Sequence, residues 1–80
     1  MIKVLYFAAA RDEIGPREEE FALDGVKVVA DLRAKLCAKY ASAAEILRGV
    51  TFARNLEYVE DDAPVHAGDE IAVIPPISGG

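Results

Sequence analysis

The residues of this chain with the most direct chemical potential are its last six: Pro75, Pro76, Ile77, Ser78, Gly79 and Gly80. The two prolines stiffen the chain into an extended rod. The glycines lack a Cβ, so the end of the chain can enter a narrow channel in another protein. A carboxylate is a poor acyl donor until it is joined to a nucleotide phosphate as a mixed anhydride. The pattern therefore predicts activation of the backbone carboxylate of Gly80; the alternative is a Gly-Gly end without a function.

Side chains offer weaker candidates for a catalytic or metal site. The sequence has one cysteine, Cys37, and one histidine, His66, which is too few for an internal disulfide or a zinc site. We expect Cys37 to fill space beside the apolar face of a helix and His66 to be solvated in a loop. The acidic run 60–62 is expected to form a solvated turn, and the run 18–20 to protect a sheet edge. We therefore predict no metal ion and no bound cofactor.

Length and charge exclude several classes of protein. Eighty residues form one small domain, and a hydrophobic content of 52% is too high for a disordered chain. The net charge of -5, from 9 basic and 14 acidic residues, provides no basic surface for nucleic acid. No apolar run approaches the ~20 residues of a membrane span, and the first residues are expected to form a strand rather than a signal peptide. Together with the single cysteine, this predicts a cytoplasmic location.

The strands and turns follow from hydrophobic runs and from glycine and proline. Strands are predicted at residues 2–7, 18–23, 51–54, 58–59 and 70–74. The first and last are the most hydrophobic, so we expect them to pair in parallel at the centre of the sheet. Residues 12–16 are predicted to form a turn, because Gly15-Pro16 marks a reversal of the chain. The prolines at 75 and 76 end the last strand, since proline cannot donate to a strand ladder.

Between residues 28 and 40 the apolar residues recur with the period of an α-helix. Four positions share one face of this helix: Val29, Leu32, Leu36 and Tyr40. The N-terminus of the helix lacks a side-chain acceptor of the usual short kind at Lys27 or Val28. A second short helix is expected over residues 41–48. A mixed sheet that cups one main helix is the β-grasp, or ubiquitin-like, arrangement of the α+β class, which we predict for residues 1–74, with an extended tail at 75–80.

The end of the chain resembles a known family. Residues 68–80, GDEIAVIPPISGG, are similar to the C-terminal signature of the MoaD-type sulfur carriers, the small subunits of molybdopterin synthase in the MoaD/ThiS family. Residues 2–8, the helix start at 29–32 and Asn55 followed by Val59 also fit, so the resemblance covers nearly the whole chain. Two departures are Val28, where the family often has a capping threonine, and Arg54, where an aliphatic residue is usual.

The resemblance implies a cycle of sulfur transfer. An adenylating enzyme similar to ubiquitin-activating enzymes uses ATP and magnesium to adenylate Gly80, and a persulfide-derived sulfur converts the adenylate to a thiocarboxylate. The tail then enters the large synthase subunit and donates sulfur to cyclic pyranopterin monophosphate, forming the dithiolene of molybdopterin. In this reading the chain is a non-catalytic sulfur donor, the catalytic side chains belong to the large subunit, and two small and two large subunits form a heterotetramer.

Strand alternation predicts an apolar face near the tail. If the even-numbered residues of the first strand meet the helix, then Leu5, Phe7 and Ile74 lie on the open face, where an apolar patch marks an interface. A small domain also needs aromatic side chains inside, so a core position for Phe7 is the alternative. The resemblance implies that Phe7, Tyr58 and Ile74 bind the partner, with Arg11 at the rim.

Other functions are compatible with a Gly-Gly tail on this fold. A thiazole-synthesis carrier shares both features but typically lacks a proline pair before the tail, so Pro75 and Pro76 argue against it. A carrier for tRNA thiolation, a ubiquitin-like modifier joined to lysines through Gly80, and an interaction module with an inert tail are the further alternatives.

Overall fold

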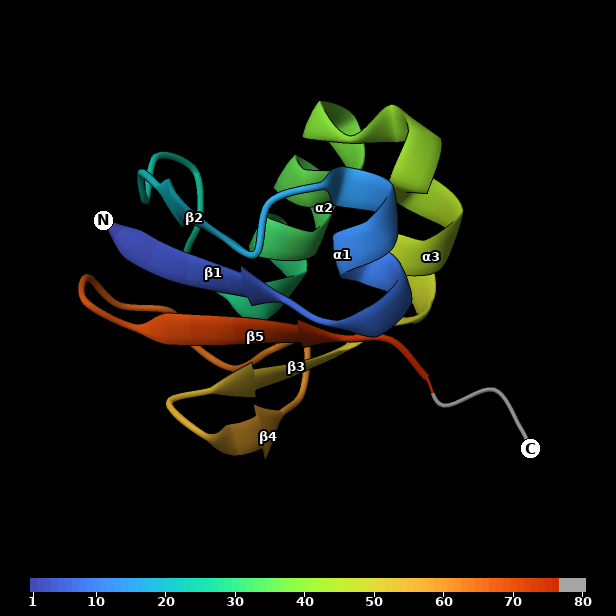
Figure 1. Cartoon of the computed structure of the whole chain (residues 1–80). Helices are drawn as coiled ribbons and strands as arrows, with labels where there is room; N and C mark the ends of the chain where they lie inside the picture. The colour runs from blue at the N-terminus through green and yellow to red at the C-terminus, as the bar shows by residue number, and fades with distance from the viewer. Residues whose placement is uncertain (77–80) are drawn as a thin grey trace.

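Strands β1 (Ile2–Tyr6) and β5 (Glu70–Ile74) pair in parallel at the centre of a five-stranded sheet in the computed structural model, which describes residues 1–76. Strand β2 (Glu18–Phe21) pairs antiparallel with β1, and β3 (Thr51–Arg54) pairs antiparallel with β5. Strand β4 (Glu57–Val59) completes the order β2-β1-β5-β3-β4. The predicted central pairing of the first and last strands is confirmed (Figure 1).

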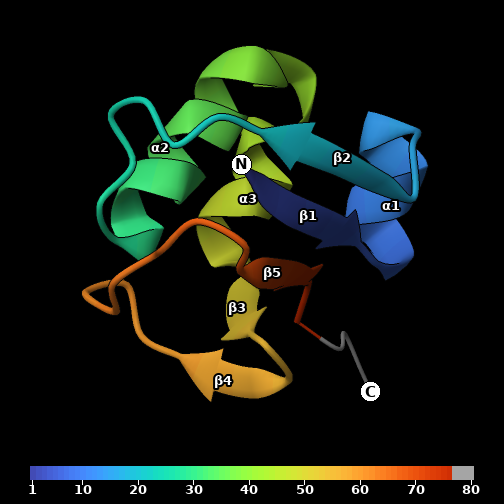
Figure 2. The ribbon, with the colours of Figure 1, turned by 90° about the vertical axis from the view of Figure 1, so that its left-hand side faces the viewer.

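Helices cover one face of this sheet. They are α1 (Ala8–Ile14), α2 (Val29–Lys39), the 3-10 helix η1 (Ala41–Ala43) and α3 (Ala44–Gly49). Figures 1 and 2 show α2 and α3 on the same side of the strands. The predicted β-grasp class is confirmed, with the main helix one residue shorter at each end than expected. No helix within residues 1–76 has the length and apolar character needed to cross a membrane.

The core lies between the helices and the sheet, and alternation along the strands builds it. Ile2, Val4 and Tyr6 are buried against the helices, whereas Lys3 between them is exposed. The remaining fully buried large side chains come from the sheet and from α2 and α3: Leu32, Leu36, Leu47, Phe52, Ile71, Val29 and Val73. The odd-numbered residues of β1 therefore face away from the core, as predicted.

Helix α1 corrects the prediction of a turn at residues 12–16. The backbone is helical from Ala8 to Ile14 and reverses only at Gly15, which has a positive φ of 110° and donates its N–H to the carbonyl of Arg11 at 2.8 Å. Alanine is the strongest helix former, and Ala10 is buried while Ile14 packs against the core. The apolar residues of this short helix are three consecutive alanines and Ile14, which give no clear amphipathic pattern, so the Gly15-Pro16 signal dominated the prediction.

The start of α2 is capped from inside the helix. Val28 has no side-chain acceptor, but the Asp31 carboxylate accepts the backbone N–H groups of Lys27 at 2.9 Å and Val28 at 3.1 Å. These two hydrogen bonds lower the pKa of Asp31. The predicted lack of a side-chain acceptor at Val28 is confirmed, and Asp31 compensates by supplying the carboxylate half of a capping box.

Edge strand β2 is tied to the helix layer through Glu19. Its carboxylate accepts hydrogen bonds from the hydroxyls of Tyr6, at 2.9 Å, and of Tyr40, and it pairs with the ammonium of Lys39. The Tyr6 and Tyr40 rings meet edge to face, with centroids 6.3 Å apart. Burial raises the pKa of Glu19, but the hydrogen bonds from Lys39, Tyr40 and Tyr6 outweigh it, so the pKa lies below its ordinary value of 4.5. The predicted protective run of glutamates therefore contains one residue with a structural role.

We expect Glu19→Gln to reduce the free energy of unfolding by about 1–2 kcal/mol at pH 7, since hydrogen bonds to a charged group stabilise more than neutral ones. Because the pKa of Glu19 is lowered by folding, its contribution is present above the pKa of the unfolded chain and is lost as pH falls through the lower, folded value. Thermal unfolding from pH 7 to pH 3 should show the difference from wild type shrinking with acid. The exposed neighbour Glu20 is the control: Glu20→Gln should cost little at any pH, and an equal cost at both sites would contradict the role of Glu19.

Candidate functional site

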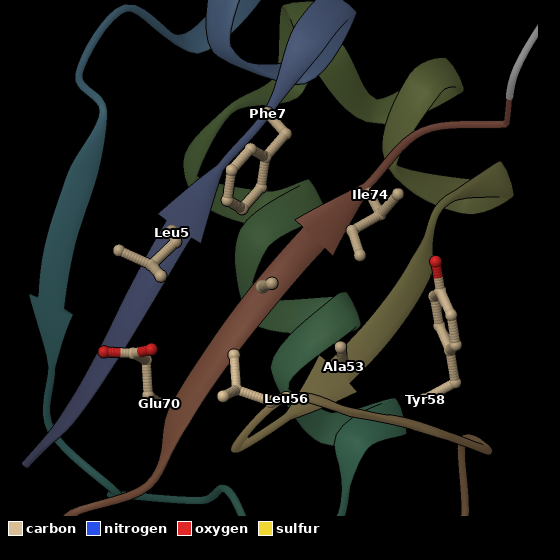
Figure 3. Close-up of a pocket in the computed structure, with 8 residues that line it drawn as sticks. Leu5, Phe7, Ala53, Leu56, Tyr58, Glu70 and Ile74 are labelled. Atoms are coloured by element: carbon tan, nitrogen blue, oxygen red, sulfur yellow. The ribbon is translucent and has the colours of Figure 1, made fainter.

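On the face of the sheet that points away from the helices, two alanines lie side by side. Ala72 of β5 lies between Leu5 of β1 and Ala53 of β3, and Ala53 lies opposite Tyr58 of β4. In Figure 3 the side chains of this face rise from the four strands toward the viewer, and the helices lie behind them. Two small residues surrounded by large ones leave a depression in the sheet surface.

This depression is a pocket of about 250 Å³. We call it the docking pocket. The residues that line it are Leu5, Phe7, Ala53, Leu56, Tyr58, Glu70, Ala72 and Ile74. Within residues 1–76 four large hydrophobic side chains are exposed, and three of them, Phe7, Leu56 and Tyr58, line this pocket. Apolar side chains gathered in this way are typical of a protein interface.

The structure places most of the predicted partner-binding residues here. Phe7 is 48% exposed, so the alternative of a core position is wrong and the open-face prediction is confirmed. Ile74 and Tyr58 line the same pocket from β5 and β4. Arg11 lies exposed on α1 and does not line the pocket, so a rim contact for Arg11 remains a prediction.

Four lining residues were not among those predicted for this surface: Ala53, Leu56, Glu70 and Ala72. Strand alternation over 70–74 places Glu70 on the face of Ala72 and Ile74, so the sequence held a signal for it. Leu56 lies in the turn between β3 and β4, where no periodicity exists, and its position depends on the turn's backbone.

Asn55 fixes that turn against the start of β5. Its backbone N–H donates to the Glu70 carbonyl at 2.8 Å, its side-chain amide donates to the Asp69 carboxylate at 3.0 Å, and its side-chain oxygen accepts the Glu70 N–H at 3.0 Å. Burial raises the pKa of Asp69, but the hydrogen bonds from the His66 backbone and the Asn55 amide outweigh it, and the pKa is lowered. The hairpin tip is thereby held beside the pocket.

The exit of β5 adjoins the docking pocket. Ile74 is the last residue of the strand and lines the pocket; Pro75, which follows directly, is buried, and Pro76 is exposed. The other predicted tail residues, Ile77, Ser78, Gly79 and Gly80, lie outside the described residues.

The remaining candidates lie away from this site. Cys37 packs partly buried against the core, as expected. His66 is exposed, and its backbone N–H is bound to Asp69. The acidic run 60–62 includes a turn, in which Asp61 forms an ion pair with Arg33 at 2.7 Å. In residues 1–76 no group of three or more His, Cys, Asp or Glu side chains could hold a metal ion.

The chemistry of the docking pocket suits binding rather than catalysis. Its ionisable side chains are one carboxyl, Glu70, and one phenol, Tyr58; the rest of the lining is hydrocarbon. A nucleophile paired with a base, which covalent catalysis needs, is absent from this lining. The arrangement can hold an apolar partner surface next to the point at which the tail leaves the domain.

Comparisons with known proteins agree with the observed fold and place the chain in a family. Residues 4–80 match the ThiS family. The chain is 41% identical over 81 residues to the molybdopterin synthase sulfur carrier subunit of Chlamydomonas reinhardtii, covering 99% of this chain and 98% of that protein. The structure is similar to a putative molybdopterin converting factor, subunit 1, from Pyrococcus furiosus (TM-score 0.81, 31% identity, 95% and 97% of the two chains). It is also similar to SAMP1 from Haloferax volcanii (TM-score 0.82, 25% identity, 99% and 98%).

Proposed function

The chain belongs to the ThiS family, and from this membership we propose that it is the sulfur carrier subunit of a molybdopterin synthase. The relative from Chlamydomonas reinhardtii has that name and aligns with this chain over nearly the full length of both. The resemblance of the C-terminal residues to the sulfur carriers points the same way.

The main structural support is the continuity of strand, pocket and tail. Strand β5 is hydrogen-bonded on both sides, to β1 and to β3, so its end is a fixed point. Ile74 belongs at once to this strand and to the docking pocket. A protein that covers the pocket therefore contacts the domain directly beside Pro75 and Pro76, and a defined contact of this kind supports the positioning that a reacting carboxylate requires.

The proposed cycle uses the carboxylate of Gly80. An activating enzyme joins it to AMP from ATP, with magnesium, and releases pyrophosphate. A sulfur nucleophile then attacks the carbonyl carbon, AMP leaves, and Gly80 ends in a thiocarboxylate. On the large subunit, the thiocarboxylate sulfur is transferred to cyclic pyranopterin monophosphate, and hydrolysis restores the carboxylate. Two such transfers supply the sulfur atoms of the dithiolene.

The large subunit is the partner that we propose for the docking pocket. The catalytic side chains are proposed to belong to that subunit, as the family resemblance implies. ATP-dependent activation and the free thiol of Cys37 fit a cytoplasmic setting, which we propose for the protein.

A second candidate is a protein modifier, favoured by the structural similarity to SAMP1, which is also described as small archaeal modifier protein 1. In that case Gly80 would form an isopeptide bond with a lysine of another protein. The two candidates share adenylation and differ in the group that attacks the adenylate.

Intact-mass spectrometry separates these candidates. The full chain is incubated with an activating enzyme, ATP, magnesium and sulfide, with and without a protein that offers surface lysines. We expect a mass gain equal to replacement of one oxygen by sulfur, dependent on ATP, and molybdopterin formation when the large subunit and the pterin precursor are added. Isopeptide-linked products without a thiocarboxylate would instead support the modifier, and an unchanged mass would contradict both.

A further inference from the structure

The isolated domain does not explain why the residue at position 56 is a leucine. Its φ of 75° lies in the left-handed region, which side chains with a Cβ avoid. The preceding Asn55, at φ 50°, tolerates that region, and the two residues form the kind of two-residue hairpin turn in which glycine is preferred at the second position. Leu56 is nevertheless 93% exposed, so it gains almost no burial in return. Strain that the fold does not need points to a function outside the domain.

The surroundings hold Leu56 at the wall of the docking pocket. The hydrogen bonds of Asn55 to Asp69 and Glu70 fix the turn, and Figure 3 shows the Leu56 side chain between Glu70 and Ala53, on the same face as Phe7. The hairpin therefore presents an apolar group that is already in place before a partner arrives, which reduces the entropy lost on binding.

Glu70 gives the pocket one charged end. It lies where β5 begins, whereas Phe7 and Ile74 lie at the other end, where β1 and β5 finish. Lys3, its neighbour in register on β1, forms an ion pair with Glu18 at 3.6 Å. None of the ion pairs within residues 1–76 involves Glu70. A partner cation can therefore reach this carboxylate without displacing another.

We infer that Leu56 and Glu70 select the partner surface: the large subunit inserts one nonpolar side chain over Ala72, against Leu56, and places a lysine or arginine beside it on Glu70. This inference rests on the proposed function. The pocket volume of about 250 Å³ is below the ~300–1,000 Å³ of small-molecule sites, which favours a side chain as the occupant. Ile74 makes the pocket continuous with the tail, so the occupant belongs to the protein that receives the tail.

Two other occupants fit less well. A second copy of this chain would bring together two chains that each have a net charge of -5, and a symmetric contact would place one Glu70 near the other. The activating enzyme also receives the tail, but a stable synthase subunit needs a lasting interface, which is where pre-positioned apolar groups have their largest effect.

Leu56→Gly tests the inference because it should weaken binding of the large subunit without destabilising the domain. Glycine relieves the left-handed strain, so the melting temperature should rise or stay unchanged, while the Kd for the large subunit from the same organism should increase about tenfold. Leu56→Asn, which also tolerates the left-handed region, should weaken binding similarly. A lower melting temperature for Leu56→Gly would overturn the inference, because Leu56 would then stabilise the domain itself.

Glu70→Gln tests the charged end. We expect the Kd to increase about fivefold at low salt and the difference to shrink as salt is added, since screening weakens the pair. The control is Glu57→Gln. Glu57 directly precedes Tyr58 on β4, so its side chain points to the other face of the strand, and the variant should bind as the wild type does.

Sulfur loading of the wild type, measured separately by intact mass, tests the proposed function independently of the inference about Leu56 and Glu70. A wild-type chain that acquires no sulfur contradicts the proposed function. A chain that loads and binds the large subunit, while Leu56→Gly and Glu70→Gln bind with the wild-type Kd, overturns only the inference. Variants that slow activation but bind the large subunit normally also overturn it, and assign the pocket to the activating enzyme. A loaded wild type that does not bind the large subunit overturns it as well.

Discussion

One alanine added after Gly80 is expected to abolish sulfur loading while leaving the melting temperature unchanged. The added residue moves the terminal carboxylate by roughly 3.3–3.6 Å along an extended chain. A misplacement of about 1 Å can already cost a factor of about 10² in rate, so we expect the yield of thiocarboxylate to fall at least that far. Intact-mass spectrometry after incubation with the activating enzyme, ATP and sulfide measures it. Deletion of Gly80 should have the same effect.

The matched control adds one alanine before Met1 instead. Met1 is exposed at the opposite end of the chain, so this variant should load sulfur at the wild-type rate. If the chain extended after Gly80 also loads and donates sulfur normally, the terminal carboxylate is not the reacting group and the proposed mechanism is wrong.

Phe7→Ala is expected to weaken binding of the large subunit far more than it destabilises the domain. Phe7 is half exposed and lines the docking pocket, and aromatic residues at the centre of an interface typically contribute about 2 kcal/mol or more to binding. We therefore expect the Kd to increase about 30-fold. Isothermal titration calorimetry gives the Kd, and differential scanning calorimetry gives the melting temperature of the free chain.

Tyr6 provides the comparison for this variant. It is the last residue of β1 and directly precedes Phe7, but it faces the core, and its side chain is almost completely buried. Tyr6→Ala should cost about 3–5 kcal/mol of stability, as other large-to-small core changes do. If Phe7→Ala lowers stability and binding by equal free energies, Phe7 supports the fold and does not form the docking surface.

The sequence was a good guide wherever local pattern and tertiary structure agree. Ile2, Val4 and Tyr6 alternate with polar or half-exposed residues, so the buried face of β1 could be predicted, and with it the exposure of Phe7. The hydrophobicity of the first and last strands likewise predicted their central pairing.

The features that were missed depend on contacts between distant residues or on backbone geometry. Glu19 acquires its role from Tyr40 and Lys39, twenty or so positions away, and no local pattern contains that information. Leu56 is in the pocket because of a left-handed turn; the sequence predicted the strands on either side of residues 55–57 but not the backbone between them. The helix after β1 was missed because alanines form helices without producing an amphipathic pattern.

The double pairing of β5 has a mechanical consequence. A pull on the end of the chain would act along β5, and β1 and β3 would resist it through ladders on both sides. Ladder hydrogen bonds run across the strands, so such a pull shears many of them together rather than opening them one at a time. We expect the domain to withstand repeated insertion and withdrawal of its tail without unravelling.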